Sequence, residues 1–230
     1  MTAAFLIEQA LNGLQLGVML FLMAAGLTLV FGVMGLINLA HGALYMTGGF
    51  TCAYVAGQTG SFWLGLGAGV GAAAAVGALV EIGVMRRLYD RDHLDQVLAT
   101  FALILIFSEG ARMLSGGRPL WLDIPDSLSG SVTLPGGAAY PVYRLAIIGA
   151  GLAVGGGLWL LIRRTRLGMR IRAGQSDREM IDALGVDIAR LYTAVFALGA
   201  GLAGLAGAMV GALQSVEVGM GEPVLILAFV

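Results

Sequence analysis

A small polar interruption, Gly35-Leu36-Ile37-Asn38-Leu39-Ala40-His41-Gly42, divides the first long apolar segment of the chain. The nearest acidic residues on either side are Glu8 and Glu81, and neither Lys nor Arg lies between them. His41 is therefore the one side chain in this segment that titrates near neutral pH. The interruption is either a turn between two membrane helices or a broken helix that faces a polar group inside the membrane.

The composition is typical of a protein whose solvent is mostly lipid. The 230 residues are 58% hydrophobic and 12% charged, whereas a soluble domain carries roughly 25% charged residues. The net charge of −1 gives no reason to expect a nucleic-acid partner. Cys52 is the single cysteine, which excludes an intrachain disulfide and a multi-cysteine metal site. The 37 glycines indicate helices whose backbones pack closely together.

The apolar runs predict an all-α polytopic membrane protein that forms a single transmembrane domain over residues 1–230. About 20 apolar residues are needed to cross a bilayer, so we expect about six or seven transmembrane helices in this chain. The predicted runs are 9–35, 42–57, 62–85, 97–114, 143–162, 191–213 and a segment that begins at Pro223. The run 42–57 is either a full span or a re-entrant helix. Because the last run stops at Val230, we expect the chain to be incomplete at its C-terminus.

The arginines orient this arrangement, since short cytoplasmic loops are enriched in basic residues. The loops 86–96 and 163–190 hold most of the 13 arginines, so both are expected on the cytoplasmic side. The N-terminus is then outside if 42–57 crosses the membrane and inside if it is re-entrant.

The loop 163–190 contains a predicted two-turn helix. Ser176 is expected at its N-cap with Glu179 three residues later, as in a capping box. Gly185 stands where a C-cap glycine is expected. The apolar residues of the helix are predicted on one face: Met180, Ile181 and Leu184. A helix this short needs packing to be stable, either against the chain itself or against a partner.

Two functional interpretations of Asn38–Gly42 remain open at this stage. A helix N-terminus inside the membrane presents N–H groups that suit a carboxylate, and Asn38 and His41 would add hydrogen bonds. Alternatively, the stretch is a hairpin turn in which Asn38 caps a helix and His41 faces headgroups or a neighbouring helix.

Signatures of catalysis and of nucleotide binding are missing from the sequence. The chain has no Lys, so a P-loop lysine is ruled out. It has two histidines, His41 and His93, and no H-E-x-x-H motif, so we expect no metal site and no catalytic residues. Glu81 and Glu109 are each followed by a nearby arginine, Arg86 and Arg112, which favours structural ion pairs.

The sequence resembles a known family of membrane proteins. The segment Ala25-Gly26-Leu27-Thr28-Leu29-Val30-Phe31-Gly32, together with the 35–42 stretch and Tyr45-Met46, resembles the first signature of the LivH-type permeases. Arg163-Arg164-Thr165 and Ala183-Leu184-Gly185-Val186 resemble the cytoplasmic loop of the same family. These permeases are membrane subunits of ABC importers for branched-chain amino acids, and the resemblance covers essentially the whole chain.

The resemblance implies a multi-pass permease subunit in the plasma (inner) membrane of a bacterium or archaeon. Its implied partners are a second related permease or a second copy, two cytoplasmic ATPase subunits that use ATP, an external binding protein and membrane lipid. The implied translocation path includes Asn38, Ala40, His41 and Gly42. The segment 163–190 would be the coupling loop, with the helix from Ser176 to Leu184 docking on an ATPase.

Two departures from the family pattern affect these expectations. Ala43 stands where many members have an acidic residue, which leaves the substrate open. Family members also continue beyond the position at which this chain stops. The alternatives are a related permease for urea or short amides and, from another class, a passive solute channel.

Overall fold

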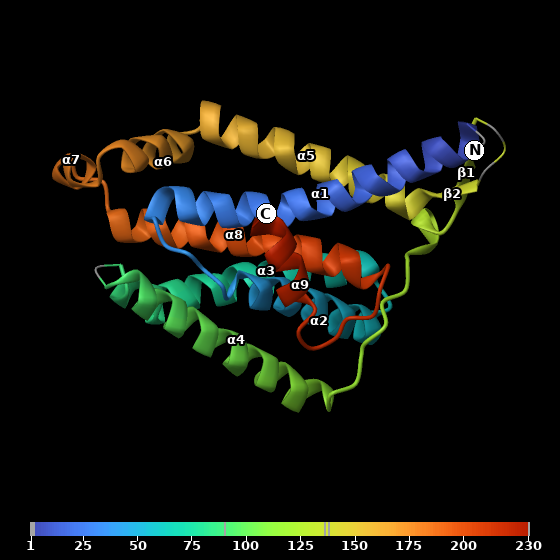
Figure 1. The fold of residues 1–230 in the computed structure, drawn as a ribbon, viewed down its shortest axis with the longest axis horizontal. Coiled ribbons are helices and arrows are strands. Elements are labelled where there is room, and N and C mark those ends of the chain that lie inside the picture. Colours follow the sequence, from blue (N-terminus) through green and yellow to red (C-terminus); the bar gives the residue numbers. More distant parts are fainter. Residues whose placement is uncertain (1–2, 90, 136, 138, 230) are drawn as a thin grey trace.

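The computed structural model describes residues 3–89, 91–135, 137 and 139–229 and shows a helical bundle with one small β-hairpin (Figure 1). The helices are α1 (Ala3–Met34), α2 (His41–Thr59), α3 (Phe62–Gly83), η1 (Met85–Arg87), α4 (His93–Ser115), η2 (Asp126–Leu128), α5 (Val142–Arg164), α6 (Arg166–Ser176), α7 (Arg178–Ala183), α8 (Ile188–Gly211) and α9 (Gly221–Phe229). The strands are β1 (Ser131–Thr133) and β2 (Ala139–Pro141).

Within the described residues, five helices are long and apolar enough to cross a membrane: α1, α3, α4, α5 and α8. The polytopic helical fold is confirmed, but the expected count of six or seven transmembrane helices is too high. The difference lies in the last run, which forms the 9-residue helix α9, and in the run 42–57, which forms α2. This helix has 19 residues, and its first six, His41 to Met46, are all buried by the rest of the chain. The first part of α2 is therefore surrounded by protein and not by lipid.

Helix α8 occupies the centre of the bundle and packs against α1, α2 and α3. Glycines allow these close approaches. A Cβ atom on Gly199 of α8 would lie 2.8 Å from the Gly26 carbonyl of α1. A Cβ on Gly48 of α2 would run into the backbone of Gly204 on α8. The glycine content is therefore used for helix packing, as the sequence predicted.

The arginine-rich segments gather at one end of the bundle. Figure 1 shows α6, α7 and the start of α4 at this end, which we call the arginine-rich end, and the N-terminus at the opposite end. At the opposite end, the Asn12 side chain of α1 accepts hydrogen bonds from Arg144 (2.6 Å) and from Tyr140 (3.3 Å). These contacts fix the start of α5 against α1.

The polar stretch between α4 and α5 contains structure that the sequence did not predict. Strands β1 and β2 pair antiparallel, with Val132 opposite Tyr140. Earlier in the same stretch, Leu120 exchanges two backbone hydrogen bonds with Val216, of 2.8 and 2.9 Å. The segment after α8 is thereby attached to the loop that follows α4.

Candidate functional site

The polar interruption begins at the arginine-rich end of the bundle. Helix α1 stops there at Met34, and the Gln175 side chain of α6 donates a 2.8 Å hydrogen bond to the Gly32 carbonyl. Gly35 follows with φ +66°, a left-handed conformation that glycine adopts without strain. The connection 35–40 then runs back along the bundle before α2 begins, as Figure 1 shows.

His41, the first residue of α2, lies inside the bundle and not at its end. A Cβ atom on Gly26 would stand 2.8 Å from His41 Nε2 and 2.6 Å from the Gly199 carbonyl of α8. His41 is therefore at the level where α1 and α8 touch. Gly26 precedes the end of α1 by eight residues, which is about 12 Å along a helix.

Three buried polar side chains at this site have no hydrogen-bond partner among the described residues. Asn38 and His41 are both 0% exposed, as is Tyr45, one turn further along α2. Among the described residues, no hydrogen bond reaches the amide of Asn38, either ring nitrogen of His41 or the Tyr45 hydroxyl. The Met23 backbone offers an acceptor to the His41 ring, but not with ordinary hydrogen-bond geometry. Unpaired buried polar groups each cost about 1–3 kcal/mol, so their accumulation in one place calls for a functional explanation.

The backbone at the start of α2 is largely satisfied by local bonds. The His41 N–H donates to the Asn38 carbonyl (3.3 Å), and the N–H groups of Ala43 and Leu44 donate to the Ala40 carbonyl (3.0 and 3.2 Å). The N-cap residue is Ala40, and within the described part of the chain no side chain caps this end. Asn38 therefore does not cap α2. The polar groups described above that lack hydrogen-bond partners belong to side chains.

Gly42 is the point at which α9 meets the site. A Cβ atom on Gly42 would lie 2.8 Å from the carbonyl of Gly221, the first residue of α9. Asn38, Ala40, His41 and Gly42 are all buried, so the structure brings the predicted path residues together in the interior.

A second polar cluster ties α3 to α8 near the arginine-rich end. Glu81 of α3 is 0% exposed, and its carboxylate accepts from Arg86 Nη2 (3.0 Å) and from the Thr193 hydroxyl of α8 (2.6 Å). Tyr89 donates a further 2.6 Å hydrogen bond to the same carboxylate. Burial, and then the bond to Glu81, raise the pKa of Tyr89, so its hydroxyl remains a donor.

The two predicted ion pairs differ in their surroundings. Arg86–Glu81 belongs to the buried cluster just described. Arg112–Glu109, at 3.3 Å, has both side chains about 60% exposed to solvent, at 60% and 62%. The sequence spacing predicted both contacts, but only the tertiary structure distinguishes the buried pair from the exposed one.

The short helix α7 begins one residue later than predicted. Ser176 is the last residue of α6, and Asp177 is the N-cap of α7, with its carboxylate accepting from the Met180 N–H (2.9 Å). The predicted capping box is therefore wrong, because α6 continues through Ser176. Glu179 lies in α7, and its side chain is outside the described part of the chain.

The C-terminal end of α7 matches the prediction. Gly185 has φ +85°, and its N–H donates to the Asp182 carbonyl (2.9 Å). The next residue, Val186, donates to the Ile181 carbonyl (3.2 Å), which completes a Schellman motif. Of the predicted apolar face, Ile181 is buried, whereas Met180 and Leu184 are 61% and 76% exposed.

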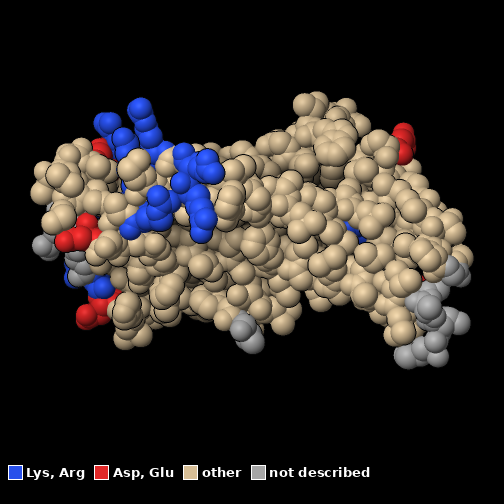
Figure 2. Space-filling model, turned by 90° about the horizontal axis from the view of Figure 1, so that it is seen from above, with Lys and Arg blue, Asp and Glu red and all other residues tan. Residues whose placement is uncertain are grey.

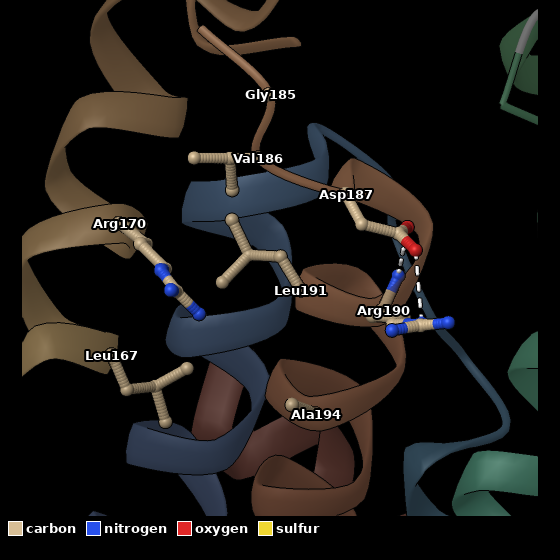
Figure 3. A pocket seen from close by; sticks show the side chains of 8 residues that line it. All are labelled: Leu167, Arg170, Gly185, Val186, Asp187, Arg190, Leu191 and Ala194. Carbon is tan, nitrogen blue, oxygen red and sulfur yellow. Dashed lines mark hydrogen bonds and ion pairs between the residues drawn. The ribbon is translucent and has the colours of Figure 1, made fainter.

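A pocket of about 320 Å³ lies between α6 and the first turns of α8. Figure 3 shows its walls, with Arg170 extending from α6 and Leu191 facing it from α8. The Asp187 carboxylate caps α8 through the Arg190 N–H (3.0 Å) and forms an ion pair with the Arg190 side chain at 2.9 Å. Hydrogen bonds of Asp187 thus hold the corner between α7 and α8. The pocket leaves open space between this corner and α6.

Two residues of these polar clusters, Tyr45 and Thr193, were not predicted from the sequence. Tyr45 is four residues after His41, so helical periodicity places it on the same face of α2. Thr193 follows Glu81 by 112 positions, and no local pattern links them. Within the described part of the chain, no group of three or more His, Cys, Asp or Glu is arranged to hold a metal ion.

The known proteins that are similar to this chain agree with its helical membrane fold. A family model described as "Branched-chain amino acid transport system / permease component" matches residues 9–230. The chain is 28% identical to the high-affinity branched-chain amino acid transport system permease protein LivH of Escherichia coli K12, over 92% of this chain and 72% of that protein.

A second relative is the permease protein BraD of Pseudomonas aeruginosa, also of a high-affinity branched-chain amino acid transport system. It is 30% identical over 89% of this chain and 70% of its own length. A putative glucose ABC transporter permease of Haloferax volcanii is 29% identical over 76% of this chain and 54% of that protein. No solved structure matches the chain.

Proposed function

Because the chain belongs to the family of permease components of branched-chain amino acid transport systems, we propose that it forms part of the path of an ATP-driven importer for aliphatic amino acids. An external binding protein would deliver the amino acid, and cytoplasmic ATPase subunits would drive its passage. A second permease, related or identical, would complete the path. The names of LivH and BraD support this substrate class.

The observation that carries the proposal is the set of unpaired, fully buried side chains Asn38, His41 and Tyr45. Amide, imidazole and phenol groups can donate to a carboxylate or accept from an ammonium group. A passing amino acid would supply both of these charged groups. Such a solute offers partners to atoms that otherwise remain unsatisfied in the interior.

Helix α7 is our candidate for the contact with the ATPase. Met180 and Leu184 place two exposed apolar side chains at the arginine-rich end, which suits a docking surface. Asp187 then leads directly into α8. The open pocket between α6 and α8 leaves room for the corner to shift.

Helix α8 would transmit that shift to the path. It touches α1 at Gly26, next to His41, and the Tyr45 carbonyl of α2 lies against Gly207. Because the backbones are in direct contact, a displacement of α8 would also move the parts of α1 and α2 that border the site.

The test is uptake of radiolabelled leucine into proteoliposomes that contain the assembled transporter, its binding protein and ATP. His41→Ala is expected to lower the uptake rate by roughly tenfold or more at equal expression, because a hydrogen bond to a charged group contributes about 1.5–3 kcal/mol. His93→Ala is the matched control, since His93 is exposed and lies outside the site. Equal uptake by both variants would remove His41 from the path. Uptake without any ATPase subunit would identify a passive channel instead.

The coupling role is tested separately. Leu184→Asp should abolish recovery of the ATPase with the permease, because a charge replaces an exposed apolar contact. Leu114→Asp provides the same change at a residue that is 92% exposed at the other end of the bundle. Normal recovery and normal uptake with Leu184→Asp would refute docking through α7.

A further inference from the structure

The end of α5 and the adjoining α6 carry an arginine patch, which we define as Arg163, Arg164, Arg166 and Arg170. All four side chains are exposed. Figure 2 shows basic side chains gathered over this part of the molecule. Among the described residues, none of the four guanidinium groups forms an ion pair with a carboxylate. The patch therefore presents positive charge that no carboxylate among the described residues neutralises.

The position of the patch follows from the helix that precedes it. Helix α5 is one of the five candidate membrane spans, and its last two residues are Arg163 and Arg164. A span that ends in charged residues ends at the headgroup region of the bilayer. The patch is thus placed where phospholipid headgroups, and not bulk water alone, surround it.

An aromatic side chain marks the same level. Trp159 lies one turn before Arg163 and is 51% exposed, and the Arg163 guanidinium stands 5.4 Å from the centre of its ring. Leu160 and Leu152 are also exposed on α5, at 52% and 66%. An outward apolar surface that ends in a tryptophan and then in arginines is the pattern of a lipid-facing helix at its interface.

The corner between α5 and α6 keeps the patch at this level. The Arg172 side chain donates to the Ile162 carbonyl at the end of α5. A Cβ atom on Gly168 would meet the carbonyls of Leu161 and Ile162. Thr165 accepts from the Gly168 N–H (3.1 Å) and caps α6. The first turn of α6 is therefore folded against α5.

From these observations we propose that the arginine patch binds the headgroups of anionic phospholipids in the inner leaflet. Guanidinium groups pair with phosphate through two parallel hydrogen bonds, and several of them together favour an anionic lipid over a zwitterionic one. Basic residues near a membrane surface each add attraction to anionic lipid. The apolar face of α5 accommodates the acyl chains. The exposed apolar residues of α7 lie beyond α6, so docking of a protein partner there leaves the patch to lipid.

The experiment uses the assembled transporter in bilayers that contain brominated phosphatidylglycerol or brominated phosphatidylcholine, both of which quench tryptophan fluorescence on contact. The difference in fluorescence between the unsubstituted protein and the Trp159→Phe variant gives the signal of Trp159. We expect phosphatidylglycerol to quench this signal several-fold more effectively than phosphatidylcholine. Equal quenching by the two lipids would overturn the proposal.

Substitutions on α6 test the arginines without changing the end of the membrane span. Replacing Arg166 and Arg170 together by Gln should remove most of this several-fold preference for phosphatidylglycerol, because basic residues near a membrane surface supply the attraction to anionic lipid. Replacing both by Lys keeps the charge and should retain most of the preference. An unchanged preference in the Gln variant overturns the proposal. So does a preference that appears only when the ATPase subunits are absent, because the patch is then a protein contact.

Discussion

The buried carboxylate of Glu81 should contribute strongly to stability, and Glu81→Ala tests this directly. The substitution removes the acceptor of the 2.6 Å hydrogen bonds from Tyr89 and Thr193. Hydrogen bonds to a charged group contribute about 1.5–3 kcal/mol each, so the loss of two costs about 3 kcal/mol at the low end. Arg86 is left out of this sum because its side chain is 38% exposed and can be rehydrated.

The assay is thermal unfolding in detergent with a thiol-reactive fluorescent dye. Cys52 is the single cysteine of the chain and is 0% exposed, so the dye reacts when the bundle opens. A loss of 3 kcal/mol in a chain of this size lowers the midpoint of unfolding by about 6–12 °C.

Glu109→Ala is the matched control. It removes a carboxylate from an ion pair of similar length, 3.3 Å, whose side chains are about 60% exposed. Exposed pairs of this kind contribute about 0–1 kcal/mol, so the midpoint should fall by no more than about 4 °C. Equal shifts for the two variants would refute the argument that burial gives Glu81 its importance.

Two further predictions concern packing and capping. Gly48→Ala should destabilise the chain by about 1–3 kcal/mol, because the new methyl group meets the Gly204 backbone. Gly57→Ala, at an open helical position, should stabilise it by up to about 1 kcal/mol, and shifts of the same sign in the dye assay would contradict this. Asp177→Ala should speed hydrogen exchange in α7, because it removes the N-cap of this helix. Ser176→Ala should leave the exchange rate unchanged. Faster exchange in Ser176→Ala than in Asp177→Ala would show that Ser176 is the cap.

The prediction of the short helix at the arginine-rich end shows where local patterns suffice and where they fail. The prediction for Gly185 is correct, because a left-handed C-cap is decided within four residues. Ser176 was placed incorrectly. Ser176 and Asp177 can both cap a helix, and Asp177 is the cap because the preceding helix α6 continues through Ser176.

The sequence by itself determined the class of the protein and the positions of its main spans. Long apolar runs have one stable solution in lipid, a helix with its backbone hydrogen bonds satisfied internally. The spans predicted at 62–85, 143–162 and 191–213 accordingly correspond to α3, α5 and α8.

Tertiary structure alone decided the start of α2 and its surroundings. A run of intermediate length is compatible with a turn, a full span or a re-entrant helix, and the choice depends on what encloses it. Here α1, α8 and α9 enclose it, and glycine contacts at Gly26 and Gly42 bring their backbones up to His41 and its neighbours. The burial of Asn38, His41 and Tyr45, like the pairing of Glu81 with Thr193, joins residues that no local pattern connects, because each contact depends on how distant helices pack.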